Sequence, residues 1–256
     1  MSADVIACFD PTSGELLGQV PVMEALEVEH AVRVARARQG AWAESRMRRH
    51  VARAVLAAVV EGQDELCRVA GHESGKSLLE ITVGELLPTC EVLRYAASRR
   101  TVAQPCGVVA VIGSGRAPLL EVLAASMPAL VEGNAVAIKL SEHTSWSGLA
   151  LVELLRDSLR EHRCSADLVQ PITGYEDTAE ALVAVADDVV DASGAASPTT
   201  PLLPALDGSD HTYALVEALV RLGYTRGIRR RARALIDTLG VVSTQARRLA
   251  VRVGSR

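Results

Sequence analysis

The chain has 256 residues, a formal net charge of −4, 49% apolar residues and only 3% aromatic residues. This predicts one large or two small globular domains with a core of alanine, valine and leucine, and no stretch is long and apolar enough to span a bilayer. The first ten residues lack the pattern of a signal peptide, and five cysteines without metal-type spacing predict a reducing, cytoplasmic location.

Charge is unevenly distributed along the chain. Residues 209–256 contain ten arginines against three carboxylates, a net charge of +7 that leaves −11 for the remainder. This asymmetry favours docking of the basic residues against the acidic remainder over binding to nucleic acid or to a membrane.

The N-terminal part predicts a hairpin followed by helices. Two short apolar segments, 5–9 and 16–22, flank the turn sequence Pro-Thr-Ser-Gly. Apolar residues at helical spacing then predict three helices, and we expect the third to be kinked or broken near Pro88. The three predicted helices span residues 24–43, 48–69 and 78–97.

The sequence His-Glu-Ser-Gly-Lys-Ser at 72–77 superficially resembles a phosphate-binding P-loop. The spacing from Gly71 is one residue too short for that motif, and no strand precedes it. We therefore interpret it as a helix end and a turn into the next helix.

Residues 107–144 predict a β-α-β unit. The β-branched run 108–112 indicates a buried strand, and a glycine-rich turn leads into an apolar helix at 119–130. Gly133 and Asn134 end that helix, and 135–140 is a second strand. Such crossovers are parallel and right-handed, and ligands bind beyond the carboxyl ends of the strands. Arg116, Lys139 and Glu142 are therefore expected at the ligand edge.

The same alternation continues to about residue 195. An amphipathic helix at 147–162, a strand at 168–172, a helix at 178–185 and a strand starting at Val189 complete a parallel, doubly wound α/β sheet. Residues 196–210 are rich in Pro, Ser and Thr and predict a linker. Residues 211–256 predict a basic tail of two amphipathic helices.

Several dispersed motifs resemble the aldehyde dehydrogenase superfamily. They are DPTSGELLGQVPV from Asp10, ESGK at 73–76 and PALVEGNAVAIKLSEHT ending at Thr144. The resemblance runs to about Ala195 and implies a Rossmann-like, NAD(P)-binding domain at 1–195 with helices packed on its sheet. Relatives carry a longer excursion before Gly107, so the family's usual tetramer is not the expected assembly here.

The resemblance also implies a cofactor site. Lys139 and Glu142 match positions that hold the adenosine ribose hydroxyls, and the carboxylate would repel a 2′-phosphate, which favours NAD over NADP. The alternative is that Lys139 and Glu142 form an ordinary surface ion pair, which contributes under about 1 kcal/mol to stability. Arg116 replaces the family's oxyanion-binding asparagine and could grip a pyrophosphate or simply be solvated. The predicted cofactor-binding residues are Ile112, Gly113, Arg116, Lys139, Ser141, Glu142, Ser193 and Gly194.

The family's chemistry needs a cysteine nucleophile and a glutamate base, which the family places downstream of Ala195. Neither motif is found, and no metal cluster or Ser/His/Asp order stands out. Cys8, Cys67, Cys90 and Cys106 are interpreted as small core residues, and Cys164 is a weak alternative nucleophile.

Three functions remain open. The first is a non-catalytic NAD(P)-binding protein, and the second is a structural or regulatory subunit. The third is an aldehyde oxidoreductase subunit completed by a partner chain. In each case the surface that the family's catalytic domain normally covers is expected to bind a protein partner or a second copy of the chain.

Overall fold

The protein is described by a computed structural model that covers residues 4–98 and 104–192. Its centre is a four-stranded parallel sheet in the order β5-β4-β3-β6. The strands of this sheet are β3 (Val108–Ile112), β4 (Ala135–Lys139), β5 (Val169–Ile172) and β6 (Asp188–Asp191). The chain runs outward from β3 to β5 and then returns to the other side of β3, which confirms the predicted doubly wound, Rossmann-like sheet.

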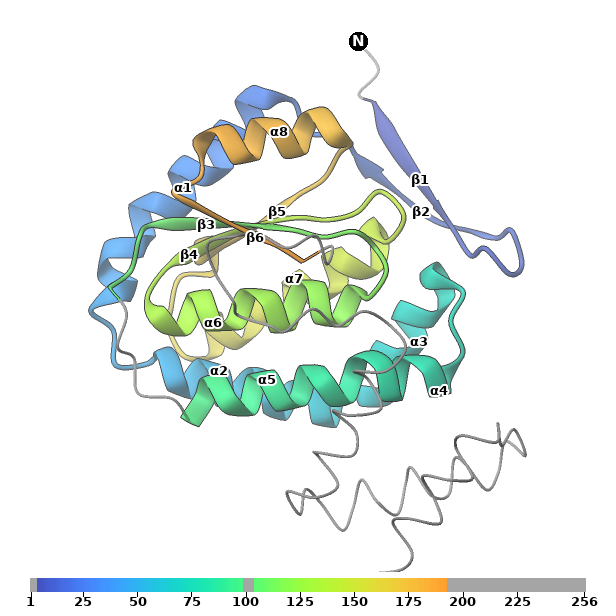
Figure 1. Ribbon diagram of the computed structural model, residues 1–256, viewed down its shortest axis with the longest axis horizontal. Helices are drawn as coiled ribbons and strands as arrows, with labels where there is room; N and C mark the ends of the chain where they lie inside the picture. The colour runs from blue at the N-terminus through green and yellow to red at the C-terminus, as the bar shows by residue number, and fades with distance from the viewer. Residues whose placement is uncertain (1–3, 99–103, 193–256) are drawn as a thin grey trace, which may run out of the picture. The chain divides into compact units, whose positions relative to one another are not determined.

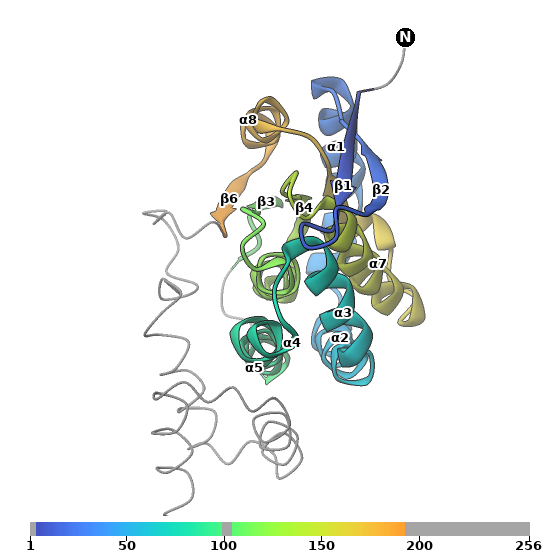
Figure 2. The same cartoon turned by 90° about the vertical axis from the view of Figure 1, so that its right-hand side faces the viewer.

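Helices cover both faces of this sheet (Figure 1). One side carries α1 (Ala25–Ala43) and α8 (Glu176–Val185), and the other carries α6 (Ala125–Glu132) and α7 (Ser145–Glu161). A further helical layer lies beyond α6 and α7, as Figures 1 and 2 show. Its members are α2 (Arg48–Glu61), α3 (Gln63–Ser74), α4 (Leu78–Ile81) and α5 (Leu87–Ser98). Because β3 and β4 are covered on both faces, they are continuously apolar before Lys139.

The predicted hairpin forms a separate antiparallel sheet. Its strands are β1 (Val5–Phe9) and β2 (Leu16–Pro21), with Val5 opposite Pro21 and Phe9 opposite Leu16. The hairpin buries one face through Ile6, Cys8 and Val20. This confirms the prediction made from the Pro-Thr-Ser-Gly turn.

The sequence predicts a single helix over 48–69, and this prediction is wrong. The structure has two helices, α2 and α3, which meet at Gly62. Gly62 ends α2 by donating its N–H to the Ala58 carbonyl and serves as the N-cap of α3. Glycine favours such a break because it is costly inside a helix. Residues 72–77 form the end of α3 and a left-handed turn at Gly75 (φ 69°), as predicted, and Ser77 caps α4.

Two wide helical turns precede prolines that lie inside helices. The π-helical turn Thr82–Leu86 leads into α5 and Pro88, and the π-helical turn Leu120–Ala124 leads into α6 and Pro128. A proline lacks the N–H that bonds four residues back, so the hydrogen-bond register is disturbed next to it. The expected break near Pro88 is thus a local widening that begins six residues upstream.

The remaining bounds agree with the predictions to within a few residues, and a 3-10 turn, Ala166–Leu168, precedes β5. The predicted linker and the basic helical tail lie outside the described residues, as do Ser193 and Gly194. Within the described ranges, no helix is both long and apolar enough to cross a bilayer.

Candidate functional site

Six of the eight predicted site residues meet at the carboxyl edge of the sheet. Ile112 and Lys139 are opposite each other in the β3–β4 register, and the Gly113 N–H donates a 3.0 Å hydrogen bond to the Lys139 carbonyl. The Ala192 N–H donates a 2.9 Å bond to the Ile112 carbonyl, so β6 ends beside the same edge. Ser141 and Glu142 follow β4 directly, and Arg116 lies in the loop that follows β3.

Lys139 is the most unusual side chain at this edge. It is only 4% exposed, and its Nζ donates one 2.8 Å hydrogen bond to the Leu140 carbonyl. The nearest carboxylate oxygen, Oε2 of Glu142, lies 4.0 Å away on a side chain that is 38% exposed. Burial lowers the pKa of Lys139, and Glu142 acts in the opposite direction. A buried ammonium has three donors, so this one keeps unused hydrogen-bonding capacity.

Leu140 stands where the resemblance implies a proline, and the structure shows what the change does. The Leu140 N–H donates a 2.9 Å bond to the Ile172 carbonyl and so extends the pairing with β5, which a proline could not do. The Leu140 side chain fills the space above Gly148 of α7, where an added Cβ would lie 2.8 Å from Cδ2. The loop after Lys139 is therefore held by both backbone and packing.

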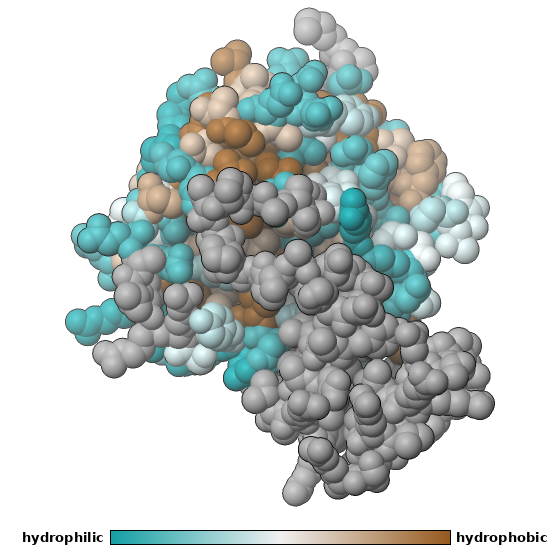
Figure 3. Space-filling view, viewed as in Figure 1, coloured by the Kyte–Doolittle hydropathy of each residue, from teal (hydrophilic) through white to brown (hydrophobic). Residues whose placement is uncertain are grey.

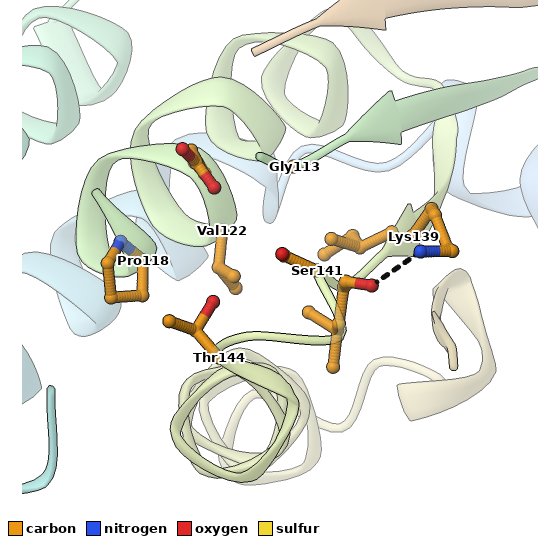
Figure 4. Close-up of a pocket in the computed structure, with 9 residues that line it drawn as sticks. Gly113, Pro118, Val122, Lys139, Ser141 and Thr144 are labelled. Carbon is orange, nitrogen blue, oxygen red and sulfur yellow. Dashed lines mark hydrogen bonds between the residues drawn. The ribbon is translucent and has the colours of Figure 1, made fainter. Parts of the chain in front are cut away.

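A small cavity lies between the start of the helix that leads into α6, the end of β4 and the start of α7 (Figure 4). Pro118 and Val122 line one side, and Ser141 and Thr144 line the other. Its volume is about 10 Å³, which is room for about one water molecule. A dinucleotide could not enter it.

Glu121 takes up the backbone donors of the glycine-rich loop. Its Oε2 accepts hydrogen bonds from the N–H groups of Ser114 (2.9 Å) and Gly115 (2.8 Å). Its Oε1 accepts from the N–H groups of Arg116 and Ala117 at 3.2 Å and from the Ser114 hydroxyl at 2.7 Å. The loop that superficially resembles a phosphate cradle is thus closed by the chain's own carboxylate.

A second carboxylate supports the same loop from below. Lys76 Nζ donates a 2.8 Å bond to Oε1 of Glu85 and another to the Arg116 carbonyl. Oε2 of Glu85 accepts the Leu119 N–H at 3.1 Å. Burial raises the pKa of Glu85, and Lys76 opposes that shift. The loop is therefore anchored at both ends while the Arg116 side chain itself remains exposed.

Glu73 plays a similar role at the start of α7. It is 4% exposed and accepts the N–H groups of Trp146 (3.0 Å) and Ser147 (2.7 Å) and the Ser147 hydroxyl (2.6 Å). A carboxylate at a helix N-terminus satisfies free donors and is favoured by the helix dipole. It fixes the helix that follows the loop containing Ser141 and Glu142.

The sequence did not point to these carboxylates. Glu73, Glu85 and Glu121 each stand in a helical segment and are 1–6% exposed. The one available signal was a carboxylate inside an apolar run, most clearly Glu121 in Leu-Leu-Glu-Val-Leu, because buried carboxylates are rare unless paired. In the described ranges, no three His, Cys, Asp or Glu side chains are grouped so as to hold a metal ion.

The five cysteines, all of them in described positions, do not form an activated thiol. Cys8 and Cys67 are buried as predicted, but the prediction of a core position is wrong for Cys106, which is exposed just before β3. Partial burial still raises the pKa of every thiol, and it raises those of Cys8 and Cys90 to about 11. Cys164 donates to the His162 carbonyl at 3.4 Å and lies in the turn after α7, away from the edge where β3 and β4 end. A thiol nucleophile needs a lowered pKa, so none of these five is prepared for attack.

Comparison with known proteins shows which family uses this arrangement. The family model described as "Aldehyde dehydrogenase family" matches residues 1–193. The chain belongs to the aldehyde dehydrogenase family. An aldehyde dehydrogenase-like protein of Schizosaccharomyces pombe is 27% identical over 203 residues, which are 70% of this chain and 39% of that protein. The chain thus spans well under half the length of this relative.

Solved structures show the same fold. An aldehyde dehydrogenase of Mycobacterium tuberculosis complexed with NAD⁺ superposes with a TM-score of 0.67 and 24% identity, over 74% of this chain and 43% of that one. A glyceraldehyde-3-phosphate dehydrogenase of Methanocaldococcus jannaschii complexed with NADP superposes with a TM-score of 0.58 and 18% identity, over 68% and 41%. These members of the aldehyde dehydrogenase fold share the doubly wound sheet of this protein.

Proposed function

We propose that this aldehyde dehydrogenase-like chain is a non-catalytic subunit that binds NAD(P) at the carboxyl edge of β3 and β4. The observation that carries the proposal is the buried Lys139 ammonium, which has one hydrogen bond and a carboxylate 4.0 Å away. Holding a cation in the interior is costly unless it is paired or bonded. A ligand with hydroxyl groups would offset that cost, because its oxygens would accept hydrogen bonds from the unused N–H groups of Lys139.

The residues at the edge fit a ribose. Lys139 can donate to a hydroxyl oxygen, and Glu142 can accept the hydroxyl protons. Ser141 lies between them in the chain, and its hydroxyl faces the small cavity (Figure 4). A bound NAD(P) would supply a hydride acceptor, while these residues would only hold and orient it. The partly exposed Glu142 would repel a 2′-phosphate, so NAD is expected to bind more tightly than NADP.

The non-catalytic half of the proposal is supported by the thiols and by the loop. Aldehyde oxidation in this family requires an activated cysteine, and all five cysteines have a raised pKa. It also requires donors for the developing oxyanion, and four N–H groups of the glycine-rich loop are already bonded to Glu121.

Calorimetric titration of the whole chain with NAD⁺ up to millimolar concentrations tests the binding half. We expect saturable heat that is lost in Lys139→Met and weakened in Glu142→Gln. Glu161→Gln, an exposed change at the far end of α7, serves as the control. If the wild-type chain gives no heat at millimolar NAD⁺, the cofactor half of the proposal is wrong. A structural or regulatory subunit is then the function that remains.

The alternative is an NAD(P)-dependent aldehyde oxidoreductase subunit completed by a partner chain. The purified chain should then form no NADH from aldehydes alone and should gain this activity when its partner is added. The proposed non-catalytic subunit forms none in either case. Aldehyde-dependent NADH from the isolated chain that vanishes in Cys164→Ala would contradict both functions.

A further inference from the structure

Two helices on opposite sides of the sheet carry exposed charges that no other described residue neutralises. On α2 the charges are basic, and Arg46, just before its start, lies on the same stripe as Arg49, His50 and Arg53. Arg49, His50 and Arg53 are spaced i, i+1 and i+4, so they share one face of the helix, and Arg46 is exposed in the turn that precedes it. The opposite face is buried through Val51, Ala52, Val55 and Val59. We call the four basic residues the α2 stripe.

Many other surface arginines in the described ranges are paired with carboxylates, and the α2 stripe differs from the exposed, unpaired Arg33, Arg116 and Arg163 in grouping several such cations together. Arg36 bonds Asp187, Arg68 bonds Glu65, and Arg160 bonds Glu153 and Asp157. Within residues 4–98 and 104–192, no carboxylate lies within ion-pair distance of a side chain of the α2 stripe. The first turn of α2 also contains no acidic residue, so the partial positive charge of the helix N-terminus adds to the stripe.

The matching surface is on α8. Glu176, Asp177 and Glu180 are exposed on one face of that helix, and none of them forms an ion pair or a side-chain hydrogen bond with another described residue. We call these three carboxylates the α8 stripe. The α8 stripe carries three negative charges, and the α2 stripe carries three positive charges when His50 is neutral.

The two stripes also match in spacing and in their apolar neighbours. Arg49 and Arg53 are four residues apart, as are Glu176 and Glu180, so both pairs repeat about every 6 Å along a helix. Each stripe is accompanied by exposed apolar side chains, Val60 (48% exposed) near the first and Tyr175 and Val183 (both 46%) near the second. Figure 3 shows apolar surface beside hydrophilic side chains in the region of α8 and the sheet.

The two stripes cannot meet within one copy, because α2 and α8 lie on opposite sides of the sheet in both views (Figures 1 and 2). We propose that the α2 stripe of one copy binds the α8 stripe of a second copy, in a head-to-tail association. An interface between two different patches leaves one stripe of each kind free at the ends, so it adds further copies instead of stopping at a dimer. This inference does not depend on nucleotide binding.

Sedimentation velocity of the full chain at 50 and 500 mM NaCl tests the association. We expect the weight-average mass to rise with protein concentration beyond that of a dimer at low salt. The apparent dissociation constant should increase about tenfold or more at high salt, because the screening length between exposed charges falls from about 14 Å at 50 mM to about 4 Å at 500 mM. A mass that stays at one copy at every concentration in low salt would contradict the proposal.

Charge-exchange variants identify the surfaces. Arg49→Glu with Arg53→Glu, and separately Glu176→Arg with Glu180→Arg, should each abolish association. A mixture of the two variant proteins should restore it, because each then offers a stripe complementary to the other. A chain carrying all four changes should also associate with itself. Circular dichroism of each variant checks folding, and Glu176→Gln with Glu180→Gln replaces the arginine variant if that one is unfolded.

The remaining outcomes decide against the proposal. If the α8 variant loses association while the α2 variant keeps it, other cations contact α8. If the wild-type chain is monomeric and a single-stranded oligonucleotide binds it through Arg49 and Arg53, the α2 stripe is a polyanion site instead. Loss of association in each variant alone, with restoration in the mixed sample and in the chain carrying all four changes, is the result that supports head-to-tail contact.

Discussion

Lys139 and Glu142 are three residues apart, and 4.0 Å separates the ammonium nitrogen of one from a carboxylate oxygen of the other. One side chain is buried and the other is about one-third exposed, so the pair joins an interior cation to a solvated anion. Such a pair gains little from its own attraction because water screens the exposed partner. The pair therefore adds little to the stability of the fold.

Lys139→Met should therefore stabilise the protein while removing nucleotide binding. An apolar side chain of similar length removes the desolvation cost of the buried ammonium, and the partly exposed Glu142 is left in contact with water, so the variant should be at least as stable as the wild type. Urea unfolding at pH 7 measures the change, and calorimetry with NAD⁺ measures the loss of binding. A variant that is less stable by more than about 1 kcal/mol would show that Lys139 is a structural cation.

The stability difference between wild type and Lys139→Met should also depend on pH. Burial lowers the pKa of Lys139 below 10.5, so the unfolded chain binds this proton more strongly than the folded chain. Wild-type stability therefore rises between the folded pKa and 10.5, and the advantage of the variant shrinks over that range. Unfolding curves of both proteins from pH 7 to pH 10.5 check this. A stability advantage of Lys139→Met that grows with pH would contradict this prediction.

Glu121→Ala should loosen the loop at 114–117 and reduce stability by about 2–3 kcal/mol, because it leaves four N–H groups and a hydroxyl without their charged acceptor. Hydrogen exchange at Ser114–Ala117 should accelerate while exchange in β4 stays unchanged. Glu29→Gln, an exposed change in α1, is the control. Unaltered exchange in the loop would mean that its conformation does not need Glu121.

Gly148→Ala should destabilise the protein by about 1–3 kcal/mol through overpacking, although alanine is normally the better helix former. The added Cβ would lie 2.8 Å from Leu140 Cδ2. Gly40→Ala is the matched control: it lies in α1 with no atom within 4 Å of the new Cβ, and it should stabilise by up to about 1 kcal/mol. Equal effects at the two glycines would show that Leu140 does not restrict Gly148.

The cysteines should react slowly with iodoacetamide. At pH 8 a thiol whose pKa is about 11 is a thiolate in roughly one molecule in a thousand, so Cys8 and Cys90 should remain unmodified in the folded chain. Cys106, the exposed cysteine, should be modified first. Peptide mass spectrometry over time follows each site. Any of the five reacting faster than a free small thiol would reveal an activated cysteine and would weaken the non-catalytic function.

Local sequence patterns were sufficient to predict the sheet. The β-branched runs at Val108–Ile112 and Ala135–Lys139 form strands because each is short, apolar and bounded by turn residues. The position of Lys139 at the end of such a run predicts that it lies at the carboxyl edge of the sheet, and the structure places it there. Gly62 was missed as a helix boundary because apolar spacing continues through it from α2 into α3.

The support beneath the site could not be predicted in the same way. Glu121 bonds to N–H groups only 4–7 residues before it, so its contacts are local. Glu73 and Glu85 bond to groups 73 and 34 residues away, and nothing near them in the sequence identifies those partners. The same limit applies to the role of Leu140, which depends on Gly148 and on the end of β5. Tertiary contacts decide what these residues do, so only the structure reveals it.

The chain contains two lysines, Lys76 and Lys139, and this permits a direct test of nucleotide binding at the sheet edge. In protein labelled with ¹⁵N at the lysine side chains, each ammonium gives its own NMR signal. Addition of NAD⁺ should shift the Lys139 signal in a saturable way and leave that of Lys76, which is held by Glu85, unchanged. A Lys139 signal that does not move at saturating NAD⁺, or a shift confined to Lys76, would contradict the proposed site.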